Sequence, residues 1–283
     1  FTDKEVTGYW CKIPLENCNE GISLFVDMFL NSLFKIDDIN KEKKVIYEEI
    51  RSSYDSPASH VNLIFENMLW PNHPMGRDIA GSINSVENIS KNSLLSFFKK
   101  KYTSSNTVIS VVGNINHNQI VDKISKILDK YGGPSENQIY TPAPKTNANF
   151  KLEVINKNTE QVHLNIGFAG IDYLNDKKYS LSLLSVILGE TMGSRLFEEI
   201  RESRGLAYNI GSNVQYFTDT GSFIIDSAVE PKNVKETIKV VQNELEKVKA
   251  NITEEELVKA KKYTIGKMYM RLEDTMSITN FLG

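Results

Sequence analysis

The stretch from Gly221 to Val258 opens with Gly-Ser-Phe-Ile-Ile-Asp-Ser-Ala-Val and continues through two charged, amphipathic segments. It reads as a strand that begins at a glycine, then a polar break, a helix, a turn led by Ile252 and a second helix. The same order occurs 213 positions earlier, from Gly8 to Val45, where Ile39 stands in the place of Ile252. Few residues are identical between the two stretches, but the order of their expected elements is the same. The sequence therefore predicts two copies of one structural unit.

The two copies differ at one informative position of their second helix. The first copy carries Glu49 there, and the same register in the second copy gives Lys262. One half therefore keeps a carboxylate where the other has an amine. This difference is expected of a duplicated domain with a single working site.

The offset also predicts sequence beyond both ends. The second unit starts near Lys151, which puts the matching start of the first unit about sixty residues before Phe1. The first unit continues for about eighty residues past its second helix, so the second is expected to extend beyond Gly283. The chain is therefore interpreted as the central piece of a longer protein.

The composition is that of a soluble globular protein with room for two domains, since 40% of the residues are apolar and 24% are charged. The net charge of −3 argues against a nucleic-acid partner. Cys11 and Cys18 lack the companions that a zinc finger or a disulfide framework needs, which favours a reducing compartment. No apolar run reaches the ~20 residues of a membrane span.

The order of elements predicts an α+β fold with two homologous domains, each a largely antiparallel sheet faced by helices and each truncated here. The first domain is expected at 1–133 and the second at 151–283, joined by a proline-containing linker at 134–150. Strands are expected at Glu5–Ile13, Thr107–Val112, Lys151–Asn156, Gln161–Phe168, Leu206–Phe217 and Ser222–Val229. Helices are expected at Asn19–Phe34, Asn40–Ser53, Ser59–Leu69, Ser90–Tyr102, Asn116–Gly132, Asp176–Leu188, Ser194–Arg201, Lys232–Lys249 and Glu254–Leu272.

The helix expected at 40–53 carries a candidate acid site. Glu49 follows Val45 by four positions and Ile46 by three, so it is expected to point with them, and Glu42 lies two turns earlier on the same face. Two carboxylates on a buried stripe cost free energy unless a cation, a metal or several donors meet them. The pattern is typical of an acid site or a metal ligand with a helper. A glutamate that leans into solvent or pairs with an arginine is the alternative that spacing leaves open.

A second candidate lies between residues 193 and 208. A short helix is expected to end near Gly205, which can adopt the left-handed cap, and a strand follows. Arg201 and Tyr208 would then lie near each other, where a guanidinium and a phenol could hold the carbonyl oxygens of a bound chain. A surface arginine beside a core tyrosine is the alternative.

Several stretches resemble the insulinase, or pitrilysin-like, metallopeptidases. The likeness is to the short, two-domain form, similar to mitochondrial processing peptidase and its bacterial relatives. The sequences that carry it are Phe1–Tyr9, Glu42–Ile50, His73–Gly76, Gly81, Gly189–Phe197 and Arg201–Tyr208.

The resemblance implies a zinc endopeptidase that cuts peptides or unfolded segments enclosed between paired chains, as a homodimer or a heterodimer with a related chain. Glu49 would be a zinc ligand, and Glu42 would be the accessory carboxylate of the catalytic site. Arg201 and Tyr208 would hold substrate backbone, and Phe1 would lie on a strand beside which substrate adds by β-pairing. A bacterial cytoplasm or an organellar matrix is the implied compartment.

One departure from the family is large. The inverted HxxEH motif, which supplies two histidine ligands and the catalytic glutamate, is absent from residues 1–283, and family spacing would put it about thirty residues before Phe1. With one ligand of three, the chain by itself is expected neither to hold zinc tightly nor to cut peptides. A non-catalytic homologue that acts as a scaffold or partner subunit is therefore the alternative. The enzyme interpretation requires Glu49 to face inward.

Overall fold

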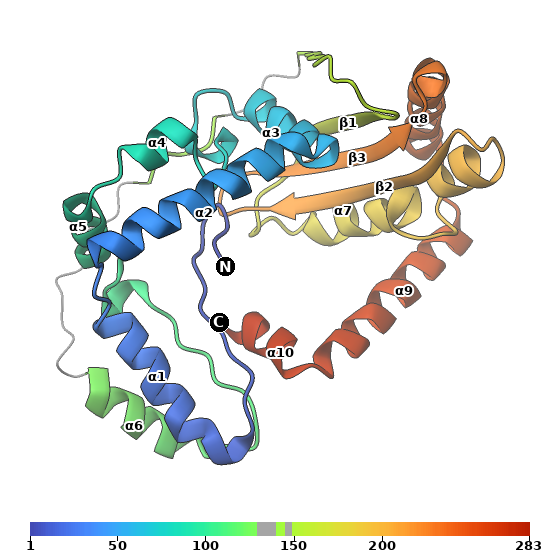
Figure 1. The fold of residues 1–283 in the computed structure, drawn as a ribbon. Helices are drawn as coiled ribbons and strands as arrows, with labels where there is room; N and C mark the ends of the chain where they lie inside the picture. Colours follow the sequence, from blue (N-terminus) through green and yellow to red (C-terminus); the bar gives the residue numbers. More distant parts are fainter. Residues whose placement is uncertain (129–139, 145–148) are drawn as a thin grey trace. The chain divides into compact units, whose positions relative to one another are not determined.

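A computed structural model describes residues 1–128, 140–144 and 149–283. It confirms the α+β fold class, since the described residues form helices and a three-stranded antiparallel sheet (Figure 1). The strands are β1 Val162–Ala169, β2 Ala207–Tyr216 and β3 Gly221–Val229. The helices are α1 Cys18–Leu30, α2 Ile36–Asp55, α3 Pro57–Leu69, α4 Ile83–Glu87, α5 Lys91–Lys101, α6 His117–Leu128, α7 Lys178–Ser185, α8 Val234–Ala250, α9 Glu254–Leu272 and α10 Thr275–Leu282, with π-helical turns at Val186–Glu190 and Phe197–Glu202.

Two compact units are assembled from separate stretches of the chain. Unit 1 comprises the described parts of 1–50, 79–140 and 267–283, and unit 2 comprises those of 51–78 and 141–266. The linker expected at 134–150 lies largely outside the described residues. The division into domains 1–133 and 151–283 stays a prediction.

Unit 2 contains the sheet, with the strand order β1-β3-β2 and antiparallel pairing throughout. The strands expected at Leu206–Phe217 and Ser222–Val229 are confirmed as β2 and β3, which form a hairpin, and the Phe217 N–H donates to the Thr220 carbonyl at 2.9 Å in its turn. Side chains alternate along a strand, so one face of β3 is apolar. That face packs against the helical segments of unit 2 through Phe223, Ile225, Val229, Leu188, Ile200, Val240 and Val241.

A second, smaller core in unit 2 is built around Trp70, which is fully buried. Its indole Nε1 donates to Thr220 Oγ1 at 3.1 Å, and its ring meets Phe217 edge-on at 5.7 Å between centroids. His73 is also buried there; its Nδ1 accepts from the Met75 N–H, and its Nε2 lies 3.1 Å from a backbone carbonyl oxygen. Both ring nitrogens of His73 therefore have structural partners.

Helix caps confirm the expected starts of two helices in unit 1. The Ser90 hydroxyl accepts from the Ser93 N–H at 3.1 Å, and the Ser93 hydroxyl accepts from the Ser90 N–H at 2.9 Å. The two residues thus form a capping box at the start of α5. Before α6, the Asn116 side chain accepts from the Gln119 N–H at 3.2 Å. Hydrogen bonds to these capping side chains therefore determine where α5 and α6 begin.

Three expected strands are wrong, namely Glu5–Ile13, Thr107–Val112 and Lys151–Asn156. Alternating residues favour a strand only where a neighbouring strand supplies ladder hydrogen bonds, and among the described residues these segments make no pairing beyond an isolated bridge between Thr2 and Thr7. Val108 and Leu152 are accordingly 74% and 75% exposed. The repeat is therefore visible in its helices, with α1 and α2 matching α8 and α9, while only the second copy has its strand.

Candidate functional site

The candidate site in unit 2 is organised by the end of a helical turn. The π-helical turn Phe197–Glu202 ends in a left-handed glycine cap, in which the Gly205 N–H donates to the Arg201 carbonyl at 3.1 Å and the Leu206 N–H donates to the Ile200 carbonyl at 2.9 Å. Gly205 has a φ of 60°, which confirms the expected left-handed cap. This motif turns the chain directly into β2.

The motif brings Arg201 and Tyr208 together. The guanidinium carbon of Arg201 lies 4.8 Å from the centre of the Tyr208 ring and 4.7 Å from that of Phe197, within the range of cation–π attraction. The expected proximity is therefore confirmed. Tyr208 is 79% exposed, so the alternative of a core tyrosine is wrong.

A β-bulge aims the Tyr208 side chain. Ala207 pairs with Val229 and Asn209 pairs with Ala228, so Tyr208 is an extra residue without a partner on β3. β2 is an edge strand of the described sheet. No described residue hydrogen-bonds the Tyr208 hydroxyl. A phenol and a guanidinium thus stand side by side at the sheet edge, with N–H and O–H donors that an incoming carbonyl oxygen could accept from.

An ion pair fixes the segment that precedes this turn. Arg195 binds Glu256 through two hydrogen bonds, Nε to Oε1 at 2.6 Å and a terminal nitrogen to Oε2 at 2.8 Å. Glu256 also closes a capping box with Thr253 at the start of α9. Hydrogen bonding from Arg195 is the main reason that the pKa of Glu256 falls to about 2. The pair joins the segment before the turn Phe197–Glu202 to the long helix α9.

A close approach of backbones fixes β2 against the helical segment beneath it. The Ser212 hydroxyl donates to the Ser185 carbonyl at 2.9 Å, and both side chains are buried. A Cβ at Gly189 would come within 2.6 Å of the Ser212 nitrogen. Only glycine fits there without a shift of the backbone.

Glu42 and Glu49 do not face inward, so this expectation is wrong. Both side chains are exposed, and no described residue forms a hydrogen bond or ion pair with either. The residues of α2 that are buried or partly buried follow a different register, at Ile39, Lys43, Ile46, Tyr47, Ile50 and Ser53. Lys43 belongs to this stripe because its amine reaches the Glu87 carbonyl at 2.9 Å while its stem lies along the helix. Glu49 lies about 100° around the helix from Ile50 and therefore flanks the buried stripe.

Phe1 does not lie on a strand. It is joined to Gly8 by two backbone hydrogen bonds of 2.9 Å, around an isolated bridge between Thr2 and Thr7. The Phe1 ring covers Gly8, where an added Cβ would overlap the ring carbons. The opening residues therefore form a small closed loop instead of the expected strand.

The described part of the chain contains no group of three or more histidine, cysteine, aspartate or glutamate side chains placed to hold a metal ion. Within the same residues, no helix is both long enough and apolar enough to cross a bilayer. Cys11 and Cys18 are free thiols.

Comparison with known proteins places these features in a family. A family profile described as "Peptidase M16 inactive domain" matches residues 88–263. This chain belongs to the M16 peptidase family. The resemblance found in the sequence is thereby confirmed.

Relatives of the M16 chain carry protease names. An "Uncharacterized zinc protease" of Rickettsia felis is 33% identical over 262 residues, which are 92% of this chain and 63% of that protein. The "Uncharacterized zinc protease YmxG" of Bacillus subtilis is 32% identical over 279 residues, 98% of this chain and 67% of that protein. The chain thus spans about 63% of the length of several curated relatives.

Solved structures share the fold of the M16 chain. The peptidase M16 inactive domain from Pseudomonas fluorescens superposes with a TM-score of 0.85 at 25% identity, covering 95% of this chain and 64% of that one. A protease from Helicobacter pylori gives a TM-score of 0.87 at 23% identity, covering 94% of this chain and 66% of that one. The second likeness shows the fold alone.

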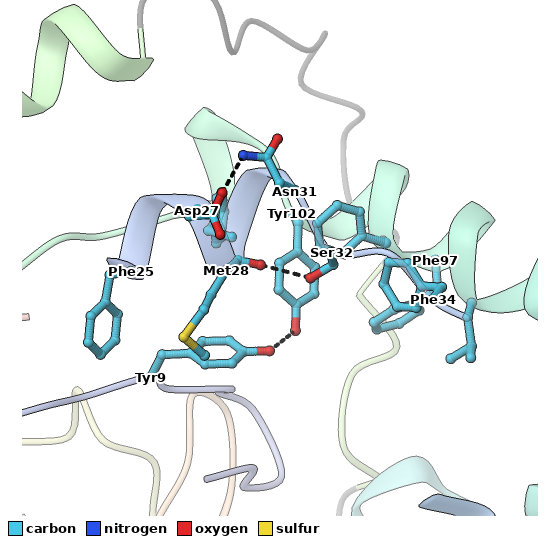
Figure 2. Close-up of a pocket in the computed structure, with 12 residues that line it drawn as sticks. Tyr9, Phe25, Asp27, Met28, Asn31, Ser32, Phe34, Phe97 and Tyr102 are labelled. Atoms are coloured by element: carbon cyan, nitrogen blue, oxygen red, sulfur yellow. Dashed lines mark hydrogen bonds between the residues drawn. The ribbon is translucent and has the colours of Figure 1, made fainter. Parts of the chain in front are cut away.

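Unit 1 of the M16 chain also holds an apolar cavity of about 480 Å³ that sequence reasoning missed (Figure 2). The hydroxyl oxygens of Tyr9 and Tyr102 lie 2.8 Å apart across it. Burial and this hydrogen bond raise the pKa of Tyr102. Phe98 stacks on Tyr102 with 4.6 Å between ring centres. The aromatic residues Phe97, Phe98 and Tyr102 were the available signal, but the sequence predicted only a helix at Ser90–Tyr102 and no cavity beside it.

Proposed function

We propose that this M16 chain is part of a zinc-dependent endopeptidase that cleaves peptides or unfolded segments. Two observations support the proposal. The first is membership of a family whose relatives are named zinc proteases. The second, which carries the proposal in this molecule, is the pair of the partly buried Arg201 and the exposed Tyr208 at the edge of the sheet.

In this proposal the pair binds the backbone of the substrate. An extended peptide at the edge of β2 would present carbonyl oxygens to the Arg201 guanidinium and the Tyr208 hydroxyl, which both donate. Stacking between two rings holds the guanidinium in place before the peptide arrives, which lowers the entropy lost on binding. A contact of substrate with Phe1 belongs to the same proposal but rests on the resemblance alone.

The residues present do not complete a zinc site. A catalytic zinc ion takes three protein ligands, and Glu49 offers one carboxylate without a second donor from the described residues. The fit is therefore incomplete within residues 1–283, and no catalytic step is derived through the metal. The exposed position of Glu49 does not meet the inward orientation that the sequence interpretation required, so the assignment of Glu49 as one ligand and Glu42 as the accessory carboxylate rests on the resemblance alone and requires an HxxEH motif in the longer protein.

The proposal includes a partner. Enclosure of a substrate would require a second chain, either another copy of this one or a related subunit. Its support is the analogy with the resembled family, and a sedimentation measurement on the full-length protein would show whether a dimer forms.

A non-catalytic scaffold or partner subunit is the second candidate function. Two observations favour it. The matching profile describes an inactive domain, and Glu49 points away from the interior of unit 1. The two functions differ in one property, because only the enzyme would need zinc for its action.

Peptide cleavage by the full-length protein tests the proposal. A fluorogenic peptide mixture is incubated with the protein, with and without a chelator, and zinc is then restored. The enzyme function predicts cleavage that the chelator stops and zinc restores, and that Glu49→Gln abolishes. Absence of chelator-sensitive cleavage would leave the scaffold function standing.

A further inference from the structure

The segment 195–204, which contains the π-helical turn and Arg201, is bordered by charged side chains. α8 contacts this segment (Figure 1), and the Arg195–Glu256 pair joins it to α9. Along the border each charge has a neighbour of opposite sign, and all of these charges belong to unit 2. In order they are Glu256, Arg195, Glu244, Lys247, Glu199, Arg204 and Glu236.

Salt bridges form most of the links in this series. On α8, Lys247 Nζ lies 2.6 Å from Glu244 Oε1. The two terminal nitrogens of Arg204 lie 3.4 Å from Glu199 Oε2 and 3.5 Å from Glu236 Oε1. The Arg204 side chain therefore bridges the segment and α8.

The other links are electrostatic and are visible in two pKa values. Hydrogen bonding to Glu256 is the main cause that raises the pKa of Arg195, and the charge of Glu244 adds to the rise. The hydrogen bond to Glu244 is the main cause that raises the pKa of Lys247; the charge of Glu199 adds to this rise and that of Arg195 opposes it. Two residues of α8, Glu244 and Lys247, thus lie close to two residues of opposite charge on the segment.

Glu244 is the buried member of the series, with 3% of its surface exposed. A buried carboxylate costs free energy unless opposite charges surround it. The same helix offers a comparison, because Glu246 and Lys249 form a second pair at 2.7 Å with side chains that are 72% and 71% exposed. An exposed pair of this kind contributes little. Burial and the nearby charge of Arg195 set Glu244 apart from it.

The rotation of the segment about its own axis decides where Arg201 points. Leu196 and Ile200 are fully buried and anchor one face of the segment in the main core. Glu199 and Arg201 are the sequence neighbours of Ile200, so their side chains leave the turn on opposite sides of it. Arg195 lies four positions before Glu199 and shares its side. Attraction of that side to α8 therefore sets the direction of Arg201 on the other side.

We propose that Glu244 is a positioning residue for the Arg201–Tyr208 pair. Together with Lys247 it holds the segment 195–204 at the rotation in which the Arg201 guanidinium meets the Tyr208 ring. The consequence for peptide binding rests on the proposed peptidase function, in which this pair binds the substrate backbone. Glu244 touches no substrate and acts through the segment.

The NMR signal of the Arg201 Nε–H group in the full-length protein tests this inference. Its absence from Arg201→Lys identifies the signal, and stacking on the Phe197 and Tyr208 rings displaces it from the position of an exposed arginine. Glu244→Gln keeps the shape of the side chain and removes its charge. We expect the signal to move at least about half of the way to the exposed position. The dissociation constant of acetyl-Ala-Thr-Val-Thr-Ala-amide, measured with a chelator present, should rise about fivefold.

Three further variants separate positioning from loss of stability. Glu246→Gln removes the same charge from the exposed pair and should leave the signal and the dissociation constant unchanged. Val241→Ala opens a cavity beneath the same helix and should lower the urea midpoint without moving the Arg201 signal. Lys247→Gln alters a side chain that is 59% exposed, so it should fold and move the signal in the same direction as Glu244→Gln.

An unmoved Arg201 signal in folded Glu244→Gln would overturn the inference, and so would an equal movement in Val241→Ala. Should Glu244→Gln fail to fold, an unmoved signal in Lys247→Gln would overturn it. The outcome is separable from that of the proposed function. A moved signal without any peptide binding by the unmodified protein would overturn the substrate-binding role of the pair and leave the positioning role standing. Chelator-sensitive cleavage with an unmoved signal would overturn the positioning role alone.

Discussion

The guanidinium of Arg201 stacks on the ring of Tyr208, 4.8 Å from its centre, although seven positions of sequence separate the two residues. The left-handed cap at Gly205 and the bulge at Tyr208 together produce this contact. Neither side chain is in the main core, so the contact does not serve to fill space. A preorganised pair of donors at a sheet edge is suited to binding an extended peptide.

Tyr208→Phe is expected to lower kcat/KM of the full-length enzyme about tenfold, because the substrate loses one hydrogen bond of about 1.4 kcal/mol. The free energy of unfolding should change by less than about 0.5 kcal/mol, since the hydroxyl is exposed and bonds no described residue. Peptide kinetics, urea unfolding and zinc content are measured on the same preparation. A large loss of zinc would contradict the placing of Tyr208 outside the metal's coordination sphere.

Gly205→Ala should destabilise the protein by about 1–2 kcal/mol, because φ at this position is 60° and an added Cβ is disfavoured there by its own backbone. No other atom lies within 4 Å of the added Cβ, so crowding adds nothing. Gly266→Ala is the matched control: its Cβ also meets nothing, but it lies within α9, where alanine should stabilise by about 0.5–1 kcal/mol. Opposite shifts in the urea midpoint are expected, and two shifts of the same sign would contradict the assignment of Gly205.

The Arg195–Glu256 pair should make stability depend on acid pH. The pKa of Glu256 is lowered in the folded protein to about 2 from an ordinary value of 4.5. A group whose folded pKa is depressed stabilises the fold above its unfolded pKa, and this contribution is lost as the pH falls from about 4.5 toward 2.

Glu256→Gln should therefore cost about 1–2 kcal/mol at pH 7 and progressively less below pH 4.5. Urea unfolding of the variant and the unmodified protein is compared between pH 7 and pH 3. Glu254→Gln, in the same first turn of α9, is the control and should show a small, nearly constant difference. A difference for Glu256→Gln that stays constant from pH 7 to pH 3 would contradict the assigned role of the pair.

Much of unit 2 was predictable from the sequence because local signals decide it. Apolar spacing in α8 and α9, and the alternating residues on either side of the turn at 217–220, gave the helices and the hairpin. Gly205 indicated both the end of a helix and the meeting of Arg201 with Tyr208. These predictions depend on neighbours in sequence, which a single chain displays directly.

The failures involve features that sequence neighbours do not decide. The segments at 5–13 and 107–112 have strand-like residues, but a strand also needs a partner in space. Whether Glu49 is buried depends on which face of α2 packs against other residues. Lys43 lies on that face because its amine donates a hydrogen bond to the Glu87 carbonyl. Helix α10 was missed although Asp274 caps it by accepting from the Ser277 N–H. The neighbouring charges of Glu244 and Arg195 come together only through the packing of α8 against the turn at 197–202.

The zinc content of full-length Glu49→Gln, measured by elemental analysis beside the unmodified protein, tests the central claim most directly. Glu48→Gln, an exposed carboxylate on the same helix, serves as the control. The peptidase account predicts about one zinc per chain in the unmodified protein and in the control, and a severe loss in Glu49→Gln. Equal zinc in all three proteins, or no zinc in any of them, would contradict the account.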